Sequence, residues 1–191
     1  GFVAATYMRG IDVVQVPTSL LAQVDSSIGG KTGINLGNSK NIIGAFHQPK
    51  ITYMNVEALK TLPEEEYISG IGEVIKYTFI EENACEEKVN FLEFLMDNYE
   101  DILDRKTTVL LKMVKICAKI KADVVDKDEK EGGLRKILNL GHTFAHGIEK
   151  LCHISHGKAV VIGMNMAFKL SLENNLIEEE YYKQFLSLCE K

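Results

Sequence analysis

The sequence predicts an α/β segment over residues 1–60 and an all-helical segment over residues 61–191. Before residue 60, short runs of strand-forming residues flank a glycine-dense stretch. After residue 60, apolar residues recur at helical spacing almost without interruption. A chain of 191 residues is long enough for one full domain, or for one domain and part of another. We therefore predict two parts, with the boundary near residue 60.

The first part contains two predicted strands. One is the β-branched run Ile11–Val16, which Pro17 ends, and the other is Ile51–Val56. The stretch between them is too rich in glycine for a long helix and suits tight turns or a hairpin; its glycines are Gly29, Gly30, Gly33, Gly37 and Gly44. This pattern indicates the trailing portion of an α/β unit.

The second part begins with a helix-start pattern at Thr61-Leu62-Pro63-Glu64, which fits a capping box with proline and acidic residues in the first turn. An apolar stripe follows, formed by Tyr67, Ile68, Ile71, Val74, Ile75 and Phe79. Further helices are predicted over Phe91–Ile102, Thr107–Val125, Leu138–Leu151 and Ala159–Leu172, and helical spacing continues from Ile177 to Lys191.

The composition excludes several classes of protein. The formal net charge is −5 and only three residues are arginine, so binding to a nucleic-acid backbone is not expected. No apolar stretch approaches the roughly 18 residues that suggest a membrane span. The four cysteines lie more than thirty residues apart without a C-x-x-C pair, which is typical of a reducing compartment. We expect a cytoplasmic protein.

Both ends of the chain resemble the interior of a longer polypeptide. Residues 1–9 lack an initiator methionine and have the apolar character of a helix interior, and residues 177–191 stop within a helical pattern that has no cap. We expect the chain to be a fragment, although a complete small protein with frayed ends is the alternative.

Histidines are concentrated in one region of the second part. Four of the five lie between positions 142 and 156, namely His142, His146, His153 and His156. His142 and His146 are four residues apart and share a helix face, and two such imidazoles with a carboxylate make a three-ligand metal site with open positions. The H-E-x-x-H motif is absent because Thr143 follows His142. Spacing alone leaves metal binding and ordinary core or surface histidines equally open.

A second candidate is the segment from Gly70 to Lys76. Each glycine inside a helix costs roughly 1 kcal/mol relative to alanine and often allows a ligand or another backbone to approach closely. Glu73 and Lys76 are three residues apart and lie opposite the apolar stripe. A solvated Glu–Lys pair is the simpler interpretation of that spacing.

Two glycine patterns fail as nucleotide motifs. Gly30-Lys31-Thr32 lacks the Walker A glycine, because Asp25 occupies that position, and Gly70-x-Gly72 has Ile75 where a dinucleotide fingerprint needs its third glycine. What remains is a set of cations near turns or helix ends: Lys31, Lys40, Lys76, Lys121, Arg135 and Lys158. If several converge, their ligand is an anion; if they do not, they are solvated surface groups.

Five segments occur in a characteristic order: PTSLLAQVDSSIGGKTGIN from residue 17, KNIIGAF from 40, GEVIKY from 72, LRKILNLGHTFAH from 134 and HGKAV from 156. Together they closely resemble the 3-dehydroquinate synthase family of sugar-phosphate cyclases, over nearly all of the chain. The resemblance implies an N-terminal α/β NAD-binding domain, a C-terminal helical metal-binding domain and an active site between them. Residues 1–60 then form the end of the first domain, and residues 61–191 form a C-terminally truncated second domain.

The resemblance also implies a reaction. A lyase that depends on NAD and on zinc or cobalt converts 3-deoxy-D-arabino-heptulosonate 7-phosphate to 3-dehydroquinate and phosphate. NAD oxidises a ring alcohol, phosphate leaves by β-elimination, the ketone is reduced again, and an intramolecular aldol step closes the carbocycle. The expected partners are this anionic substrate and a second copy of the chain in a homodimer.

Site residues follow from the same resemblance. The implied metal ligands are Glu73, His142 and His156. The implied substrate contacts are Asp25, Lys31, Asn41, Lys76, Lys121, Arg135, Asn139 and His146. The positions matching the cofactor region are Thr18, Ser19, Lys31, Lys40, Thr61 and Glu66. Serine at position 19 replaces a threonine that the family often has, and the hydroxyl is kept. His153 receives no role.

Three alternatives remain. A sister cyclase such as 2-deoxy-scyllo-inosose synthase would share the metal ligands, but its substrate lacks a carboxylate, and retention of Arg135 and Asn139 favours the first interpretation. A metal-dependent alcohol dehydrogenase is the second, and a non-catalytic metal-binding module is the third. The family's Gly-Gly-Gly-x-x-x-Asp pyrophosphate loop is not among these 191 residues, so we expect the chain to bind metal without turnover and to bind NAD too weakly to detect.

Overall fold

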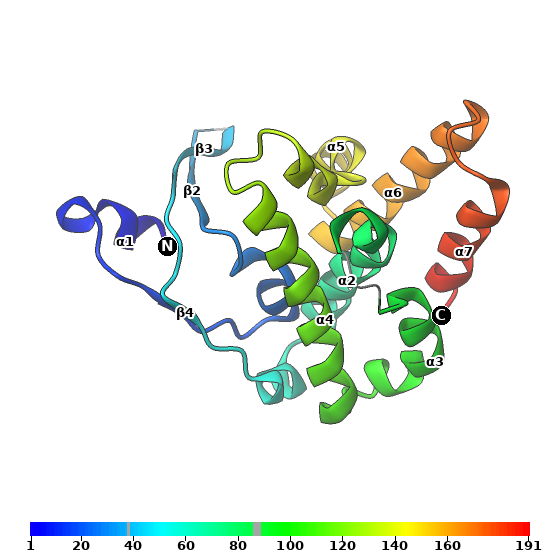
Figure 1. Ribbon diagram of the computed structural model, residues 1–191, viewed down its shortest axis with the longest axis horizontal. Coiled ribbons are helices and arrows are strands. Elements are labelled where there is room, and N and C mark those ends of the chain that lie inside the picture. Colours follow the sequence, from blue (N-terminus) through cyan, green and yellow to red (C-terminus); the bar gives the residue numbers. More distant parts are fainter. Residues whose placement is uncertain (38, 86–88) are drawn as a thin grey trace.

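The computed structural model describes residues 1–37, 39–85 and 89–191. A helical body follows a thinner N-terminal part that lies to one side of it (Figure 1). The helices of the body are α2 (Glu64–Ala84), α3 (Phe91–Leu103), α4 (Thr107–Lys127), α5 (His142–Cys152), α6 (His156–Glu173) and α7 (Glu179–Cys189). The predicted helical segment is therefore confirmed.

The N-terminal part has α/β character. It begins with α1 (Phe2–Thr6), and β1 (Val14–Gln15) pairs in parallel with β4 (Ile51–Thr52). Between them, β2 (Lys31–Leu36) and β3 (Ser39–Phe46) form an antiparallel hairpin, as the glycine-dense stretch predicts. A π-helical turn at Ala22–Ser26, which the sequence analysis does not predict, precedes the hairpin.

The strands of the parallel pair are shorter than predicted. Within the two predicted strands, the paired residues are Val14–Gln15 and Ile51–Thr52. The Tyr53 N–H still donates to the Gln15 carbonyl at 2.8 Å, but a 3₁₀ helix already begins at Val56. The cause is local: the Asn55 side chain accepts a hydrogen bond of 3.0 Å from the Glu57 N–H, so asparagine caps a new helix where the sequence suggested a strand.

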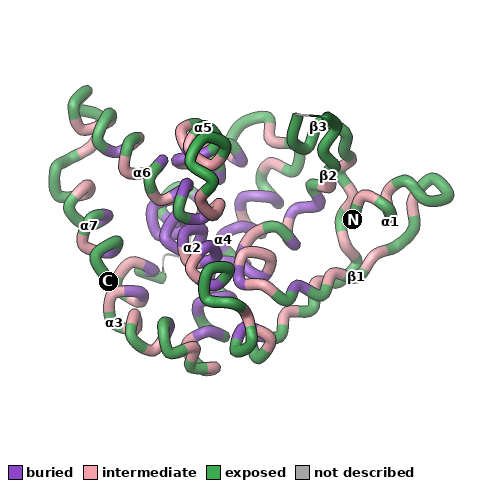
Figure 2. Tube along the Cα trace, turned by 180° about the vertical axis from the view of Figure 1, so that it is seen from behind, coloured by how far each residue is buried: buried purple, intermediate pink, exposed green. Residues whose placement is uncertain are grey.

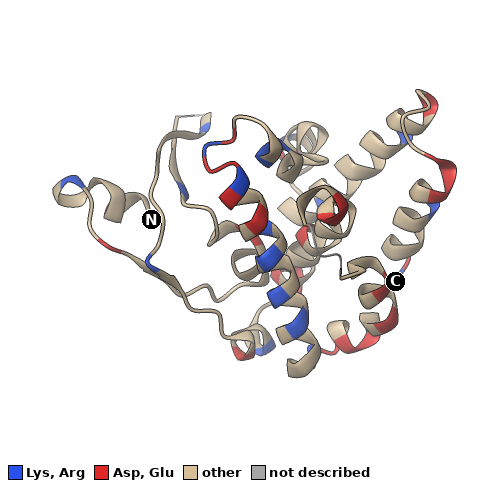
Figure 3. Ribbon diagram, in the orientation of Figure 1, with Lys and Arg blue, Asp and Glu red and all other residues tan. Residues whose placement is uncertain are grey.

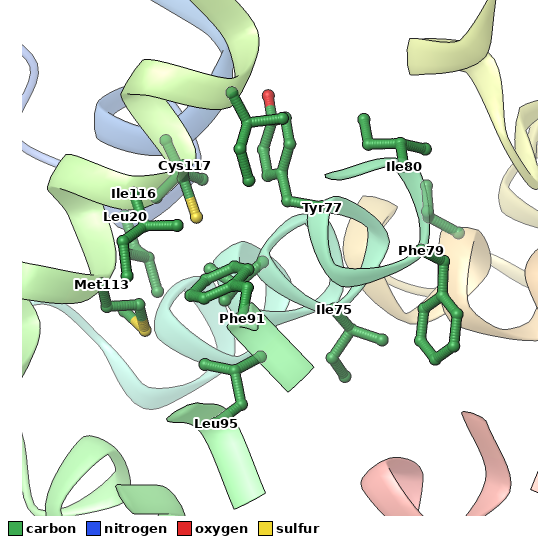
Figure 4. Close-up of a cluster of buried hydrophobic side chains, with 14 of the residues drawn as sticks. Leu20, Ile75, Tyr77, Phe79, Ile80, Phe91, Leu95, Met113, Ile116 and Cys117 are labelled. Atoms are coloured by element: carbon green, nitrogen blue, oxygen red, sulfur yellow. The ribbon is translucent and has the colours of Figure 1, made fainter. Parts of the chain in front are cut away.

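Helix α2 lies at the centre of the body, packed between α4 and α6. Buried residues concentrate around α2 and α4, whereas the N-terminal part is mostly exposed (Figure 2). The core places Tyr77 of α2 beside Cys117 of α4 and near Phe91 of α3 (Figure 4). The apolar stripe predicted on α2 is confirmed, because its residues belong to the core or pack against it. The opposite side of α2 is buried as well, including Glu73 and Lys76.

The start of α2 also differs in detail from the prediction. The helix begins at Glu64, two residues later than a capping box on Thr61 implies; Pro63 is the cap residue and no side chain caps the helix. The Thr61 hydroxyl instead donates to the Ala58 carbonyl at 3.4 Å, because Thr61 is the last residue of the preceding 3₁₀ helix. The capping-box interpretation is therefore wrong.

The helix predicted over Leu138–Leu151 is divided in two. A 3₁₀ helix ends at Asn139, Gly141 adopts a φ of 78°, and α5 begins at His142. A Cβ at Gly141 would lie 2.8 Å from the Met164 backbone nitrogen, so glycine permits both the left-handed conformation and the close approach of α6. The break places His142 on the first turn of α5.

Charged residues of both signs are spread over the helical body, with lysines along α4 and acidic residues on α3 and near the start of α7 (Figure 3). Among the described residues, none of the helices has the length and apolar character needed to cross a bilayer.

Candidate metal centre and anion pocket

Three side chains from three helices converge beside the core. The Glu73 carboxylate comes from α2, and its Oε1 lies 3.2 Å from Nε2 of His156 and 3.5 Å from Nε2 of His142. One ligand atom from each of the three residues lies within 4.8 Å of the other two. The Glu73 side chain is only 1% exposed. Two imidazoles and one carboxylate are a donor set that suits a divalent transition metal with open coordination positions.

The helix ends determine this arrangement. His142 and His156 are the first residues of α5 and α6, and their ring centroids lie 5.4 Å apart. Helix α2 passes α6 at Gly72, which brings the next residue, Glu73, to both histidines. The interpretation of the α2 glycines as points of close backbone approach is confirmed.

The tautomer of His142 is set by its own backbone. Nδ1 of His142 lies 3.1 Å from the Leu140 carbonyl oxygen, which accepts a proton and cannot donate one. Nδ1 therefore carries hydrogen in the neutral ring, and the lone pair of Nε2 faces Glu73. A histidine held in this way is ready to bind a metal through Nε2.

The charges around Glu73 are mutually dependent. Burial alone raises the pKa of Glu73, but the Lys76 ammonium and the His156 hydrogen bond outweigh burial and hold that pKa below its ordinary value. Burial lowers the pKa of His142, whereas the hydrogen bond to Glu73 raises the pKa of His156. The carboxylate is thus ionised, as a metal ligand must be.

A buried cluster of opposite charges adjoins the three ligands. Lys76 pairs with Oε2 of Glu73 and lies 3.8 Å from Oδ1 of Asp25. Lys121 of α4 donates to the same Oδ1 at 2.9 Å and to the Asp25 backbone carbonyl at 2.6 Å. The Tyr77 hydroxyl donates to Oδ1 at 2.7 Å. Because the Lys76 side chain is 2% exposed, the interpretation of Glu73 and Lys76 as a solvated pair is wrong.

Burial and the neighbouring charges shift the pKa values of this cluster in opposite directions. Burial raises the pKa of Asp25, but Lys121, Lys76 and Tyr77 more than compensate, so the net pKa lies far below its ordinary value. The pKa of Lys76 is raised despite burial, because Glu73 and Asp25 both favour its charged form. Burial lowers the pKa of Lys121, and the attraction of Asp25 offsets this only in part.

A second group of predicted residues meets at Glu131. Lys31 of β2 forms an ion pair with Glu131, and the Asn139 amide donates to Oε1 of Glu131 at 2.9 Å. Lys31 also lines a hollow of about 610 Å³ together with Ser26 and Asn41. Cationic and amide donors beside an open hollow are what an anionic ligand requires.

Arg135 is almost fully buried, with 1% exposure. Its guanidinium donates to the Gly29 carbonyl at 2.7 Å and to the Glu129 carbonyl. Arg135 therefore connects the turn before β2 to the loop after α4. Its guanidinium N–H groups, which the family resemblance assigns to substrate, donate here to backbone carbonyls.

Comparisons with known protein families test the resemblance found in the sequence. Residues 1–69 match the model of the 3-dehydroquinate synthase N-terminal domain, and residues 70–191 match that of the C-terminal domain. The chain belongs to the 3-dehydroquinate synthase family. The family resemblance found in the sequence is thereby confirmed.

Curated 3-dehydroquinate synthases are close relatives. The Alkaliphilus metalliredigens protein is 46% identical over all of the chain and 53% of its own length. The Prochlorococcus marinus protein is 52% identical over 92% of the chain and 48% of its own length. The chain thus spans about half the length of the curated relatives it matches.

Solved sugar-phosphate cyclases share the fold. A 2-deoxy-scyllo-inosose synthase complexed with carbaglucose-6-phosphate, NAD⁺ and Co²⁺ matches with a TM-score of 0.88 and 28% identity, over 98% of this chain and 50% of that one. The 2-epi-5-epi-valiolone synthase ValA from Streptomyces hygroscopicus, with NAD⁺ and Zn²⁺ bound, matches with a TM-score of 0.86 at 24% identity, over all of this chain and 52% of ValA. The dehydroquinate synthase-like fold class is confirmed.

Three further positions that the family resemblance assigns to the site are His146, Lys40 and Asn41. His146 packs edge-on against His142, with ring centroids 5.6 Å apart. Lys40 of β3 pairs with Glu149 of α5 at 2.9 Å. Asn41 adopts a φ of 52°, and its backbone N–H donates to Asn35 Oδ1 at 2.9 Å.

The positions that match the cofactor region of dehydroquinate synthases lie mostly at the surface. Thr18, Thr61 and Glu66 are exposed. Ser19 accepts a hydrogen bond of 3.3 Å from the Ala22 N–H and so caps the turn that leads to Asp25. The Thr61 hydroxyl donates to the Ala58 carbonyl. The role of these positions toward a dinucleotide stays a prediction.

Sequence reasoning missed three residues of this dehydroquinate synthase-like site: Tyr77, Glu131 and Glu149. Glu149 had a detectable pattern, because it follows His142 by seven residues and His146 by three and so shares their helix face. Tyr77 and Glu131 carried no such pattern, since their partners are 52 and 100 residues away in sequence.

Proposed function

We propose that the protein is a 3-dehydroquinate synthase, which converts 3-deoxy-D-arabino-heptulosonate 7-phosphate to 3-dehydroquinate and inorganic phosphate. The observation that carries the proposal is the convergence of Glu73, His142 and His156 beside the buried lysines Lys76 and Lys121. Identities of 46–52% to curated 3-dehydroquinate synthases support it.

Glu73, His142 and His156 fit a divalent cation, zinc or cobalt, through one carboxylate oxygen and two Nε2 atoms. When bound, the metal lowers the pKa of a substrate hydroxyl and polarises a carbonyl, and NAD serves as a transient hydride store. Lys76 keeps Glu73 ionised, because its ammonium pairs with the Glu73 carboxylate.

Asp25 holds the two buried lysines in place. Its carboxylate contacts both Lys76 and Lys121, and Tyr77 fixes that carboxylate from the side. The two ammonium groups balance the carboxylates of Asp25 and Glu73, so a divalent cation bound at the ligands would supply the positive charge that favours a phosphorylated, carboxylated substrate. None of these groups is assigned as a sole base.

Lys31 and Asn139 supply the second anion contact. Both bind the Glu131 carboxylate. We infer that a substrate anion competes with Glu131 for these donors. Arg135 contributes by anchoring the Gly29 turn that precedes Lys31.

A second candidate is the cyclisation of an uncarboxylated sugar phosphate, because a 2-deoxy-scyllo-inosose synthase matches this chain with a TM-score of 0.88. The higher identity to curated 3-dehydroquinate synthases favours the first candidate. A substrate panel that includes glucose 6-phosphate separates the two candidates.

The test is phosphate release by the full-length protein with NAD and zinc or cobalt. We expect stoichiometric phosphate and 3-dehydroquinate from the heptulosonate phosphate, no phosphate from glucose 6-phosphate, and no net NADH. Net NADH would indicate an alcohol dehydrogenase, and absence of phosphate release from the heptulosonate phosphate would contradict the proposal. The 191-residue chain alone is the control, for which we expect metal binding without turnover.

A further inference from the structure

We propose that Glu149 is a positioning residue that holds His156 in the tautomer needed for metal binding. The inference rests on the metal site proposed above. Oε2 of Glu149 lies 3.6 Å from Nδ1 of His156, on the side of the ring opposite Nε2, which faces Glu73 at 3.2 Å. The His156 ring is therefore held between two carboxylates, one at each nitrogen.

The two histidines of the cluster have corresponding environments. Nδ1 of His142 faces the Leu140 carbonyl oxygen, and Nδ1 of His156 faces the Glu149 carboxylate. Both partners are acceptors, so each favours hydrogen on Nδ1. At His156 the ionised Glu73 carboxylate favours hydrogen on Nε2 instead, so Glu149 acts against that preference and favours the tautomer in which the Nε2 lone pair is free for a metal. In metal sites, such an oxygen behind the histidine fixes ring orientation and raises ligand basicity.

The Glu149 carboxylate is itself held in place. Its other oxygen, Oε1, accepts a hydrogen bond of 2.9 Å from the Lys40 ammonium on β3. The Glu149 side chain is 21% exposed and the Lys40 side chain is 65% exposed, so this ion pair lies at the surface and outside the core. Lys40 thus directs one carboxylate oxygen away from the ring and leaves the other beside Nδ1 of His156.

The first experiment measures Co²⁺ affinity of the chain from the visible absorption of the bound ion. We expect Glu149→Leu to bind Co²⁺ about 10- to 100-fold more weakly than wild type, the effect typical of losing a carboxylate that faces the other nitrogen of a ligating histidine. Glu149→Gln should fall between them, because its amide oxygen can face Nδ1 as an acceptor but carries no charge. Glu173→Gln, which removes an exposed carboxylate from α6, is the matched control and should bind like wild type.

The second experiment reads the tautomer directly by long-range ¹H–¹⁵N correlation of the metal-free chain at a pH where His156 is neutral. We expect the fraction of His156 with hydrogen on Nδ1 to fall in Glu149→Leu and to stay unchanged in Glu173→Gln. Unaltered circular dichroism would confirm that Glu149→Leu is folded.

The outcomes separate this inference from the metal site itself. If Glu73→Gln binds Co²⁺ like wild type, the proposed site is wrong, and the tautomer measurement alone decides the role of Glu149. If Glu73→Gln abolishes binding while Glu149→Leu stays within twofold of wild type with an unchanged tautomer, the positioning role of Glu149 is refuted.

Discussion

Gly72 of α2 and Gly157 of α6 meet backbone to backbone. A Cβ built on Gly72 would lie 2.4 Å from the Gly157 carbonyl oxygen, and one built on Gly157 would lie 1.8 Å from the Ser69 carbonyl oxygen. Each glycine is adjacent in sequence to a predicted metal ligand, Glu73 and His156. The close crossing of the two helices therefore brings their ligand atoms to 3.2 Å.

We expect Gly157→Ala to destabilise the protein by about 2 kcal/mol or more, because a backbone carbonyl cannot move aside as a flexible side chain can. Thermal or urea unfolding measures this loss, and Co²⁺ binding should weaken in the same variant. Gly147→Ala is the matched control: a Cβ there meets nothing within 4 Å, so the helix should gain roughly 0.5–1 kcal/mol. Equal stabilities in the two variants would contradict the close crossing.

Asp25→Asn should destabilise the protein at pH 7 by about 3 kcal/mol, because Lys76 and Lys121 would remain buried without their shared carboxylate. Unfolding in urea at fixed pH measures the difference from wild type. Wild-type stability in Asp25→Asn would show that the buried ion cluster contributes little.

The same variant tests pH dependence. The folded pKa of Asp25 lies below its ordinary value of 3.8, so the ionised form is favoured by folding. This contribution is fully present above the unfolded pKa and is lost as the pH falls below about 3.8 toward the folded pKa. The stability gap between wild type and Asp25→Asn should thus be constant from pH 7 to 5 and narrow below pH 4. A stability difference that grows as the pH falls would show that folding raises the pKa of Asp25 instead of lowering it.

Tyr77→Phe removes only the hydroxyl that donates to Asp25 at 2.7 Å. Because this hydrogen bond is to a charged acceptor, we expect a loss of about 1.5–3 kcal/mol in unfolding free energy. Tyr182→Phe, which removes a hydroxyl bonded to the neutral Asn165 side chain, should lose less. Comparable small losses in both variants would exclude a special role for Tyr77.

Arg135→Lys keeps the charge but loses the planar fork that reaches the Gly29 and Glu129 carbonyls. We expect a drop of about 1–3 kcal/mol in stability, and a fall in kcat/KM of the full-length enzyme equivalent to roughly 1–3 kcal/mol. Urea unfolding and steady-state kinetics provide the two readouts. Unchanged values in both would refute the anchoring and substrate roles together.

Periodic features of the fold were predictable from the sequence. The helices α3 and α4 agree with their predicted ranges to within two residues, because an uninterrupted apolar spacing of 3.6 residues marks them. The glycine-dense hairpin was predictable for a similar local reason. The break at Gly141 was not, since it depends on the approach of α6 more than twenty residues later.

In the candidate site too, local patterns were predictable from the sequence and long-range contacts were not. The histidine cluster was visible in sequence, but spacing could not select a carboxylate, because Glu73 lies 69 residues before His142 and meets it only through helix packing. The burial of Lys76 was also hidden, since a Glu–Lys pair at i,i+3 looks the same on a solvated helix. Long-range packing thus determines the chemistry of residues whose local pattern is ordinary.

The central claim is that Glu73, His142 and His156 bind one divalent cation, and metal stoichiometry tests it most directly. Wild-type protein and His142→Ala are dialysed against zinc, washed free of loosely bound ion and analysed for metal and fold. His153→Asn is the control, because His153 has a φ of 52° that asparagine tolerates and lies outside the ligand set. We predict about one zinc per chain for wild type and His153→Asn and none for a folded His142→Ala; one tightly bound zinc in His142→Ala would contradict the account.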